Sequence, residues 1–258
     1  MTAQELIAAL ALPEATRLNQ RVPKKLLLEH AASSAADRRL VQDGVEELLW
    51  LAALKPHLIG VPAFDEGAHR YVELAVLLLH VRPGASVARL LTLVHRAVPY
   101  PVVLLTVAAA PAAVTLSLAH LRPAQNEAGK WVLDGEVGAW PVARPLPEGF
   151  AAALALARQP QTDLRALYQG WMDTLLALEV ARETGQFRLD ATPEQAQTRR
   201  AAWQQWRVLQ GRMAQLRAQA QRERQMARQV ALNQAIRVLL LEMEPLRAVL
   251  ASGRLGGA

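Results

Sequence analysis

Apolar residues follow a helical spacing through the N-terminal part of the chain. Between residues 35 and 55 they recur at steps of three and four, and the pattern stops before Pro56. A helix usually ends at or before the residue that precedes a proline. The spacing therefore predicts one amphipathic helix, with an apolar face made of Leu40, Val41, Val45, Leu48, Leu49 and Ala52.

A continuous apolar run then predicts the centre of a sheet. The segment RYVELAVLLLHV (70–81) is apolar on both faces, which is typical of a strand covered on both sides. A helix capped by Ser86 and stopped by Pro99 and Pro101 follows, and further strands are predicted at about 102–107, 113–120 and 130–140. N-terminal helices and a small mixed sheet predict an α+β or α/β domain over residues 1–150.

Helical patterning without a strand signal begins after VARPLPEGF (142–150). The prolines and the glycine of this segment are typical of a domain boundary. One helix is predicted to end at Gly185, and another to begin with Thr192 as N-cap and Pro193 at its first position. We therefore expect a helical connector over residues 151–190 and a coiled-coil-like arm over residues 191–258.

Two apolar seams with heptad spacing lie in this arm, and they do not share a register. The first seam is Trp206, Leu209, Met213, Leu216 and Ala220, and the second is Leu232, Ile236, Leu239, Met243, Leu246 and Leu250. Either one long helix shifts its phase between them, or the chain folds back into an antiparallel hairpin with its tip near residues 221–229. The hairpin is favoured because its two seams could bury each other.

Positive charge is concentrated in the same arm. The formal net charge of the chain is +6, while residues 199–228 contain eight arginines and a single acidic residue, Glu223. In heptads counted from Trp206, five of the arginines share the b and e positions beside the seam. Unpaired like charge favours an anionic partner, either nucleic acid or an acidic protein surface, over a merely solvated helix. The predicted binding residues are Arg199, Arg200, Arg207, Arg212, Arg217, Arg222, Arg224 and Arg228.

Two other surfaces are candidates for binding. The phrase HRAVPYP holds an aromatic side chain between two prolines and, with a later strand end, suggests a secondary patch of His95, Arg96, Tyr100, His120 and Arg122; a rigid turn explains the same phrase. A helical stripe after residue 163 packs either on this chain's own sheet or on a partner. The stripe is Leu164, Leu167, Tyr168, Trp171, Leu175 and Leu178.

Composition removes several classes of function. The chain has no cysteine, which excludes disulfides and thiol chemistry and fits a cytoplasmic protein. The N-terminus lacks the features of a secretory signal, and the uncharged stretch 97–121 is interpreted as strands around a turn at Pro111, with no membrane span.

Motifs for catalysis are also missing from the sequence. The six histidines have no metal-ligand spacing. Ala75 stands two residues after Glu73, where a metal-dependent nuclease would need a lysine. The sequence also has no glycine-rich phosphate loop and no Gly-x-Ser-x-Gly elbow. We expect no catalytic, metal or cofactor site.

Several phrases together resemble a known bacterial family. They are RVPKKLLLEH, LLWLAALKPHLIGVP, HRAVPYPVVLL, LSLAHLRP, LYQGWMDTLLALEVARETGQF and RQVALNQAIRVLLLEM. The family is the one catalogued as domain of unknown function 4391, and the resemblance covers nearly the whole chain. It implies a setting beside helicases and DNA methyltransferases in restriction-like or phage-defence gene clusters. Where members tend to carry a lysine after the histidine, this chain has Leu121, so a phosphate contact there would depend on Arg122 alone.

Three hypotheses of function follow. The first is a non-catalytic accessory subunit of such a system, which docks a helicase or methyltransferase and contacts DNA or a second subunit through the arm, as a hetero-complex or a homo-oligomer. The second is a metal-dependent nuclease with an unrecognised site. The third is an assembly scaffold without nucleic-acid contact.

Overall fold

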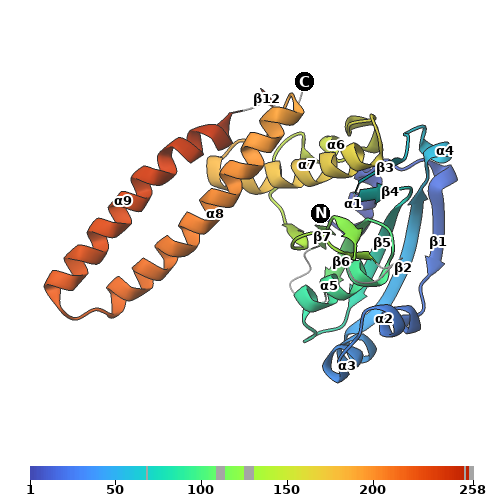
Figure 1. Cartoon of the computed structure of the whole chain (residues 1–258), viewed down its shortest axis with the longest axis horizontal. Coiled ribbons are helices and arrows are strands. Elements are labelled where there is room, and N and C mark those ends of the chain that lie inside the picture. Colours follow the sequence, from blue (N-terminus) through green and yellow to red (C-terminus); the bar gives the residue numbers. More distant parts are fainter. Residues whose placement is uncertain (68, 109–113, 125–130, 253, 256–258) are drawn as a thin grey trace. The chain divides into compact units, whose positions relative to one another are not determined.

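The computed structural model describes residues 1–67, 69–108, 114–124, 131–252 and 254–255. It confirms the α+β class, with N-terminal helices, a mixed sheet of six strands and a helical C-terminal region (Figure 1). Pro111 and most of the predicted turn at 122–129 lie outside the described residues. None of the described helices combines the length and the apolar character that a membrane span requires.

Two compact units share the chain. Unit 1 consists of Met1–Leu146 with Ala151–Met172, and unit 2 consists of Pro147–Phe150 with Asp173–Ala258. The helix α7 (Leu164–Thr184) belongs to both, since its first turns lie in unit 1 and the remainder in unit 2. Residues 151–172 thus pack with the sheet unit, although the composition of 142–150 predicted a boundary before them.

The six-stranded sheet of unit 1 has the order β1–β2–β5–β6–β7–β10. Strands β5 and β6 are parallel, because α5 (Val87–Ala97) crosses between them, and each other neighbouring pair is antiparallel. The strands are β1 (Arg17–Arg21), β2 (Val45–Leu54), β5 (Leu74–Val81), β6 (Val102–Ala108), β7 (Val114–Leu118) and β10 (Gly138–Val142). All of β5 except the half-buried His80 is buried, as predicted for a strand covered on both faces.

The predicted helix over residues 35–55 is wrong in its second half. The helix α3 (Ala35–Gly44) ends at Gly44, and the chain continues as β2, paired with both β1 and β5. The ladder to β5 has register irregularities after Val45 and after Trp50. Such bulges interrupt the strict alternation of a strand, so the apolar residues of β2 mimicked helical spacing.

Two other predicted strands are divided in the structure. Residues 69–71 form β4, which pairs with β3 (Phe64–Glu66) in a separate small sheet, rather than the start of the central strand. Residues 130–140 contain β9 (Trp131–Leu133), paired with β8 (Leu121–Pro123), and then β10 at the edge of the main sheet. Gly135 between them has a φ of 89°, a turn conformation that suits glycine.

One face of the sheet is covered by α2 (Lys24–His30), α3 and α5. Leu77, Leu79 and Leu104 from the central strands pack there against Leu27 and Leu90 of the helices. The Arg89 guanidinium on α5 donates two hydrogen bonds of 2.7 Å to the Asp37 carboxylate on α3. This bidentate contact, the largest cause, lowers the pKa of Asp37 to about 2.

Smaller helical elements complete unit 1. The Leu10 carbonyl at the end of α1 accepts a hydrogen bond of 2.9 Å from the Leu156 amide, and α1 also contacts β6. These elements are α1 (Ala3–Ala9), α4 (Pro56–Ile59) and 3-10 turns at Glu14–Thr16 and Leu156–Arg158, while α6 (Phe150–Ala153) starts at the division between the units.

Unit 2 is built on a helical hairpin. The helices α8 (Pro193–Arg222) and α9 (Met226–Ala251) lie side by side and antiparallel, joined by residues 223–225 (Figure 1). This confirms the favoured hairpin and its tip near 221–229. The Thr192 side chain accepts from the Gln195 amide at 3.3 Å, as its predicted capping role requires. Unit 2 is not wholly helical, because β11 (Arg188–Leu189) pairs with β12 (Arg254–Leu255).

Candidate nucleic-acid interface

The two predicted seams close on each other inside the hairpin. Trp206, Met213 and Ala220 of α8 are at most 8% exposed, and Leu239, Met243 and Leu250 of α9 are at most 4% exposed. Leu176 and Val180 of α7 join the same cluster near the open end of the hairpin. Burial of these apolar side chains holds the hairpin in one register and points the intervening polar residues to solvent.

Arg199 does not belong to the exposed basic surface. It is 2% exposed, donates to the backbone carbonyls of Arg188 and Ser252, and lies 3.3 Å from the Asp190 carboxylate. Burial lowers the pKa of its guanidinium, and the charge of Asp190 opposes that shift. Its predicted role as a binding residue is therefore corrected: Arg199 connects the start of α8 to the end of α9.

Arg200 is also engaged within unit 2. Its Nη1 donates to both oxygens of Asp173, each at 2.7 Å. The predicted continuous ridge at the b and e positions is wrong as well, because the chain reverses after α8. Arg224 lies in the turn and Arg228 on α9, so neither continues the α8 heptads.

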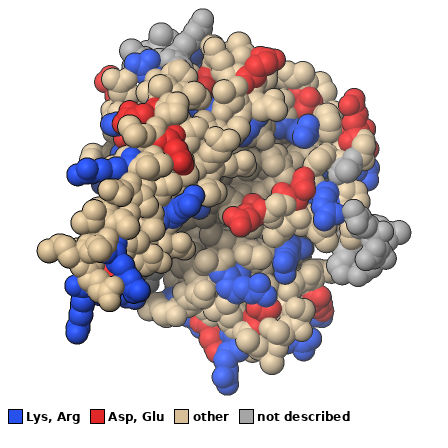
Figure 2. Space-filling model, turned by 60° about the vertical axis from the view of Figure 1, so that its left-hand side comes forward, with Lys and Arg blue, Asp and Glu red and all other residues tan. Residues whose placement is uncertain are grey.

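Six of the eight predicted arginines are exposed on the hairpin, and none of these six forms an ion pair within the described part of the chain. They are Arg207, Arg212, Arg217, Arg222, Arg224 and Arg228. Figure 2 shows basic side chains distributed over the hairpin, at the left, as separate points rather than one strip. The arginines closest to the turn are Arg222, Arg224 and Arg228, which we call the tip arginines.

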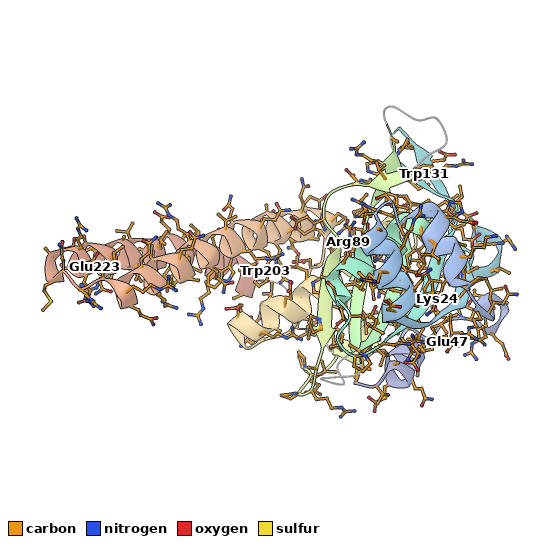
Figure 3. All side chains as sticks on the ribbon, turned by 90° about the horizontal axis from the view of Figure 1, so that it is seen from below. Lys24, Glu47, Arg89, Trp131, Trp203 and Glu223 are labelled. Carbon is orange, nitrogen blue, oxygen red and sulfur yellow. The ribbon has the colours of Figure 1, made fainter. Side chains whose placement is uncertain are left out.

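The distal half of the hairpin holds all of the chain's net charge. From Arg207 to Arg237 there are seven arginines, one glutamate and no other ionised side chain, a net charge of +6 that equals that of the whole sequence. The glutamate is Glu223, which Figure 3 shows at the closed end, and its carboxylate accepts a hydrogen bond of 2.9 Å from the Gln225 amide. The closed end of the hairpin is therefore a strongly cationic surface.

The proposed secondary patch does not form one surface. His95 is 1% exposed and lies 3.0 Å from the Ser117 hydroxyl on β7, whereas Arg96 is exposed and Tyr100 is half-buried. Burial lowers the pKa of His95 to about 3. His95 is thus a neutral core residue and cannot contribute a surface contact.

The burial of His95 predicts a pH dependence of stability. The unfolded chain protonates this imidazole below its ordinary pKa of 6.5, while the folded chain does not until about pH 3. Stability should therefore fall as the pH drops through this window, by up to about 1.4 kcal/mol per pH unit. We expect His95→Gln to show a flatter profile than wild type in urea denaturation between pH 6.5 and 4, and parallel profiles would contradict the assignment.

His120 lies in a polar cluster with Tyr71 and Gln169 that the sequence did not reveal, and Arg122 lies outside it. The Tyr71 hydroxyl donates to Nδ1 of His120, whose Nε2 lies 2.9 Å from Oε1 of Gln169 on α7. Burial is the largest cause that lowers the pKa of His120 and raises the pKa of Tyr71, so both rings stay neutral. Because both imidazole nitrogens are occupied, His120 joins α7 to the small sheets rather than offering a free ligand.

A partly exposed group of polar side chains around Asp134 lies in the same unit. Nε2 of His69 is 2.9 Å from one oxygen of Asp134, and Nε of Arg122 is 3.7 Å from the other. His69 and Asp134 are 65 positions apart, so no local motif could have linked them. Among the described residues, no three His, Asp or Glu side chains converge as metal ligands.

The stripe predicted for partner docking is buried. Leu167 and Tyr168 are fully buried, and Trp171 and Leu175 are 1% exposed. The Tyr168 hydroxyl donates to the Val102 carbonyl at 2.8 Å and accepts from the Ala119 amide at 2.9 Å, and Trp171 donates to the Leu154 carbonyl at 2.8 Å. The first part of the stripe therefore completes the core of unit 1, and its assignment as a docking surface is corrected.

Comparison with known proteins identifies the family of the chain. The family described as domain of unknown function (DUF4391) matches residues 10–242, which include the sheet, α7, α8 and most of α9. No curated protein and no solved structure matches the chain. The protein therefore belongs to the DUF4391 family.

Proposed function

We propose that the protein is an accessory subunit of a multi-gene phage-defence or DNA-modification system, and that the closed end of its hairpin binds nucleic acid. One observation carries the second part of this proposal: the seven arginines from Arg207 to Arg237 are all exposed and form no ion pair among the described residues. Arginine pairs well with phosphate because its planar guanidinium presents several donors at once.

The distribution of the arginines favours a sequence-tolerant mode of binding. On α8 they fall at four different heptad positions and so do not follow one face, and the polar residues between them are mostly glutamines. Contacts of this kind neutralise phosphates without reading base edges. An acidic protein surface is the second candidate, since carboxylates accept the same guanidinium hydrogen bonds.

Fluorescence anisotropy of the full chain with labelled duplex and single-stranded DNA tests the proposal. We expect binding to several unrelated sequences at low salt, weakening steeply as salt is added. Polyglutamate serves as the competitor that represents an acidic protein surface. If polyglutamate displaces the DNA at equal charge concentration, or if the protein does not bind DNA at low salt, the arginines are better explained as contacts to an acidic protein.

The accessory role rests on the gene setting beside helicases and DNA methyltransferases that the resemblance to this one family implies. Co-purification of the tagged chain with the products of neighbouring genes tests it. Incubation of the pure protein with plasmid and Mg²⁺ or Mn²⁺ separates this role from the nuclease alternative, because nicking that a chelator abolishes would support a metal-dependent nuclease.

A further inference from the structure

The helix α9 carries a second apolar stripe that the hairpin does not bury. Val230, Val238 and Leu241 are 50%, 54% and 73% exposed, respectively, in contrast to the seam residues between them. With Val238 as heptad position a, the outer a and d positions are Ala231, Gln234, Val238, Leu241, Pro245 and Ala248, and all of them are exposed or half-exposed. The helix α9 therefore has an inner seam that α8 covers and an outer row, apolar at Val238 and Leu241 and interrupted by Gln234, that no described residue covers.

The outward face of α8 differs from that of α9. Most of its residues are polar or small, and the one exposed large apolar side chain among them is Val208, which is 70% exposed. The others are Arg200, Gln204, Arg207, Gly211, Gln215, Ala218 and Arg222. Solvent-facing helices normally look like this one. The outer stripe of α9 is thus a feature of one helix and is not general to the hairpin.

Residues at the flanks of the stripe indicate what covers it. Arg237 occupies a g position and Glu242 the e position five residues later, and both are exposed without an ion pair in the described residues. In a parallel pair of helices, g of one chain meets the following e of the other. Two copies would therefore form two symmetric Arg237–Glu242 ion pairs. Of the other e and g positions of α9, Glu244 would meet Val249 and Arg228 follows a g position that lies before the helix, so neither adds a like-charge pair; the remaining ones, Val230, Ala235 and Ala251, are uncharged.

The apolar positions agree with the same arrangement. A β-branched residue at a followed by leucine at d favours parallel two-stranded pairing, and Val238 and Leu241 have this order. An antiparallel pair centred on Leu241 would instead bring the two Glu242 carboxylates together. We propose that two copies of this chain associate in parallel along the outer stripe of α9.

Parallel association has a consequence for the proposed function, although the association itself does not depend on nucleic-acid binding. The closed ends of both hairpins would lie at the same end of the pair, and so would both sets of tip arginines. A polyanion could then contact two basic ends at once, which raises the effective concentration of the second contact.

Sedimentation velocity of the full chain tests the association without any nucleic acid. We expect a monomer–dimer equilibrium over roughly a hundredfold range of protein concentration. Leu241→Arg should shift it to monomer; because the side chain is 73% exposed, the fold should be preserved, which circular dichroism verifies. Met226→Arg, which replaces an apolar residue 76% exposed at a c position outside the outer a and d row, is the matched control and should still dimerise.

Charge exchange establishes the orientation. Arg237→Glu alone and Glu242→Arg alone should each weaken the dimer, and the double variant should restore it. Since the natural chain has no cysteine, Ala248→Cys introduces a single thiol. Its oxidation should link two parallel copies at this d position. A monomer at every concentration, a dimer that survives Leu241→Arg, or rescue of Arg237→Glu by Glu244→Arg instead of Glu242→Arg would overturn the proposal.

Discussion

Replacing Trp171 by alanine is expected to destabilise unit 1 by about 3–5 kcal/mol, the usual cost of truncating a large buried aromatic residue. Trp171 is 1% exposed, and its indole Nε1 donates a hydrogen bond of 2.8 Å to the Leu154 carbonyl. The substitution leaves a cavity in the core and removes the donor from that buried carbonyl. Urea denaturation of the full chain, followed by circular dichroism, measures the loss as a lower midpoint.

Trp131→Ala provides the control for this variant. Trp131 lies on β9 and is half-buried, so its removal should cost far less than that of Trp171. An unchanged midpoint for Trp171→Ala, combined with loss of a co-purifying partner, would contradict the core assignment. That outcome would restore the docking role for the α7 stripe.

The second large effect concerns the tip arginines. Changing Arg222, Arg224 and Arg228 to glutamine should weaken duplex binding on the order of a hundredfold at about 0.15 M salt, if each contacts one phosphate. All three are exposed, and none makes an ion pair within the described residues, so their removal should not destabilise the hairpin. Anisotropy titration with labelled duplex DNA gives the affinity, and thermal unfolding confirms the fold.

A variant with the same change of charge elsewhere separates local contact from general attraction. Arg17, Arg39 and Arg158 of unit 1 are exposed, and changing them to glutamine removes three positive charges as well. We expect this control to bind DNA within a few-fold of wild type. Equal weakening by the two variants would mean that net charge, and not the hairpin tip, determines binding.

Much of the fold was predictable because the buried residues of a regular helix or strand recur at a fixed spacing along the sequence. The inner seams of α8 and α9, the caps of Thr192 and Gly185 and the buried central strand follow from apolar spacing and turn chemistry. The strand β2 was not predictable in this way. Its bulges remove the period of two, and its identity depends on pairing with strands distant in sequence.

The candidate site was predicted only in part, for similar reasons. The concentration of arginine in one helical segment was visible in composition, but its internal partners were not. Arg199 and Arg200 are neutralised by Asp190 and Asp173, which precede them in separate segments and meet them only in the fold. Heptad counting through Arg224 and Arg228 failed because the chain reverses at residues 223–225, where no glycine or proline marks the turn.

The most direct test of the central claim is the salt dependence of DNA binding by wild type and by the variant with the three tip arginines changed. The slope of log K against log salt concentration reports how many phosphate charges the protein neutralises, at about 0.9 per contact on duplex DNA. If the closed end of the hairpin contacts phosphates, the slope for the variant should be shallower by about 2.7. Identical slopes and affinities for the two proteins would contradict a nucleic-acid interface at the hairpin tip.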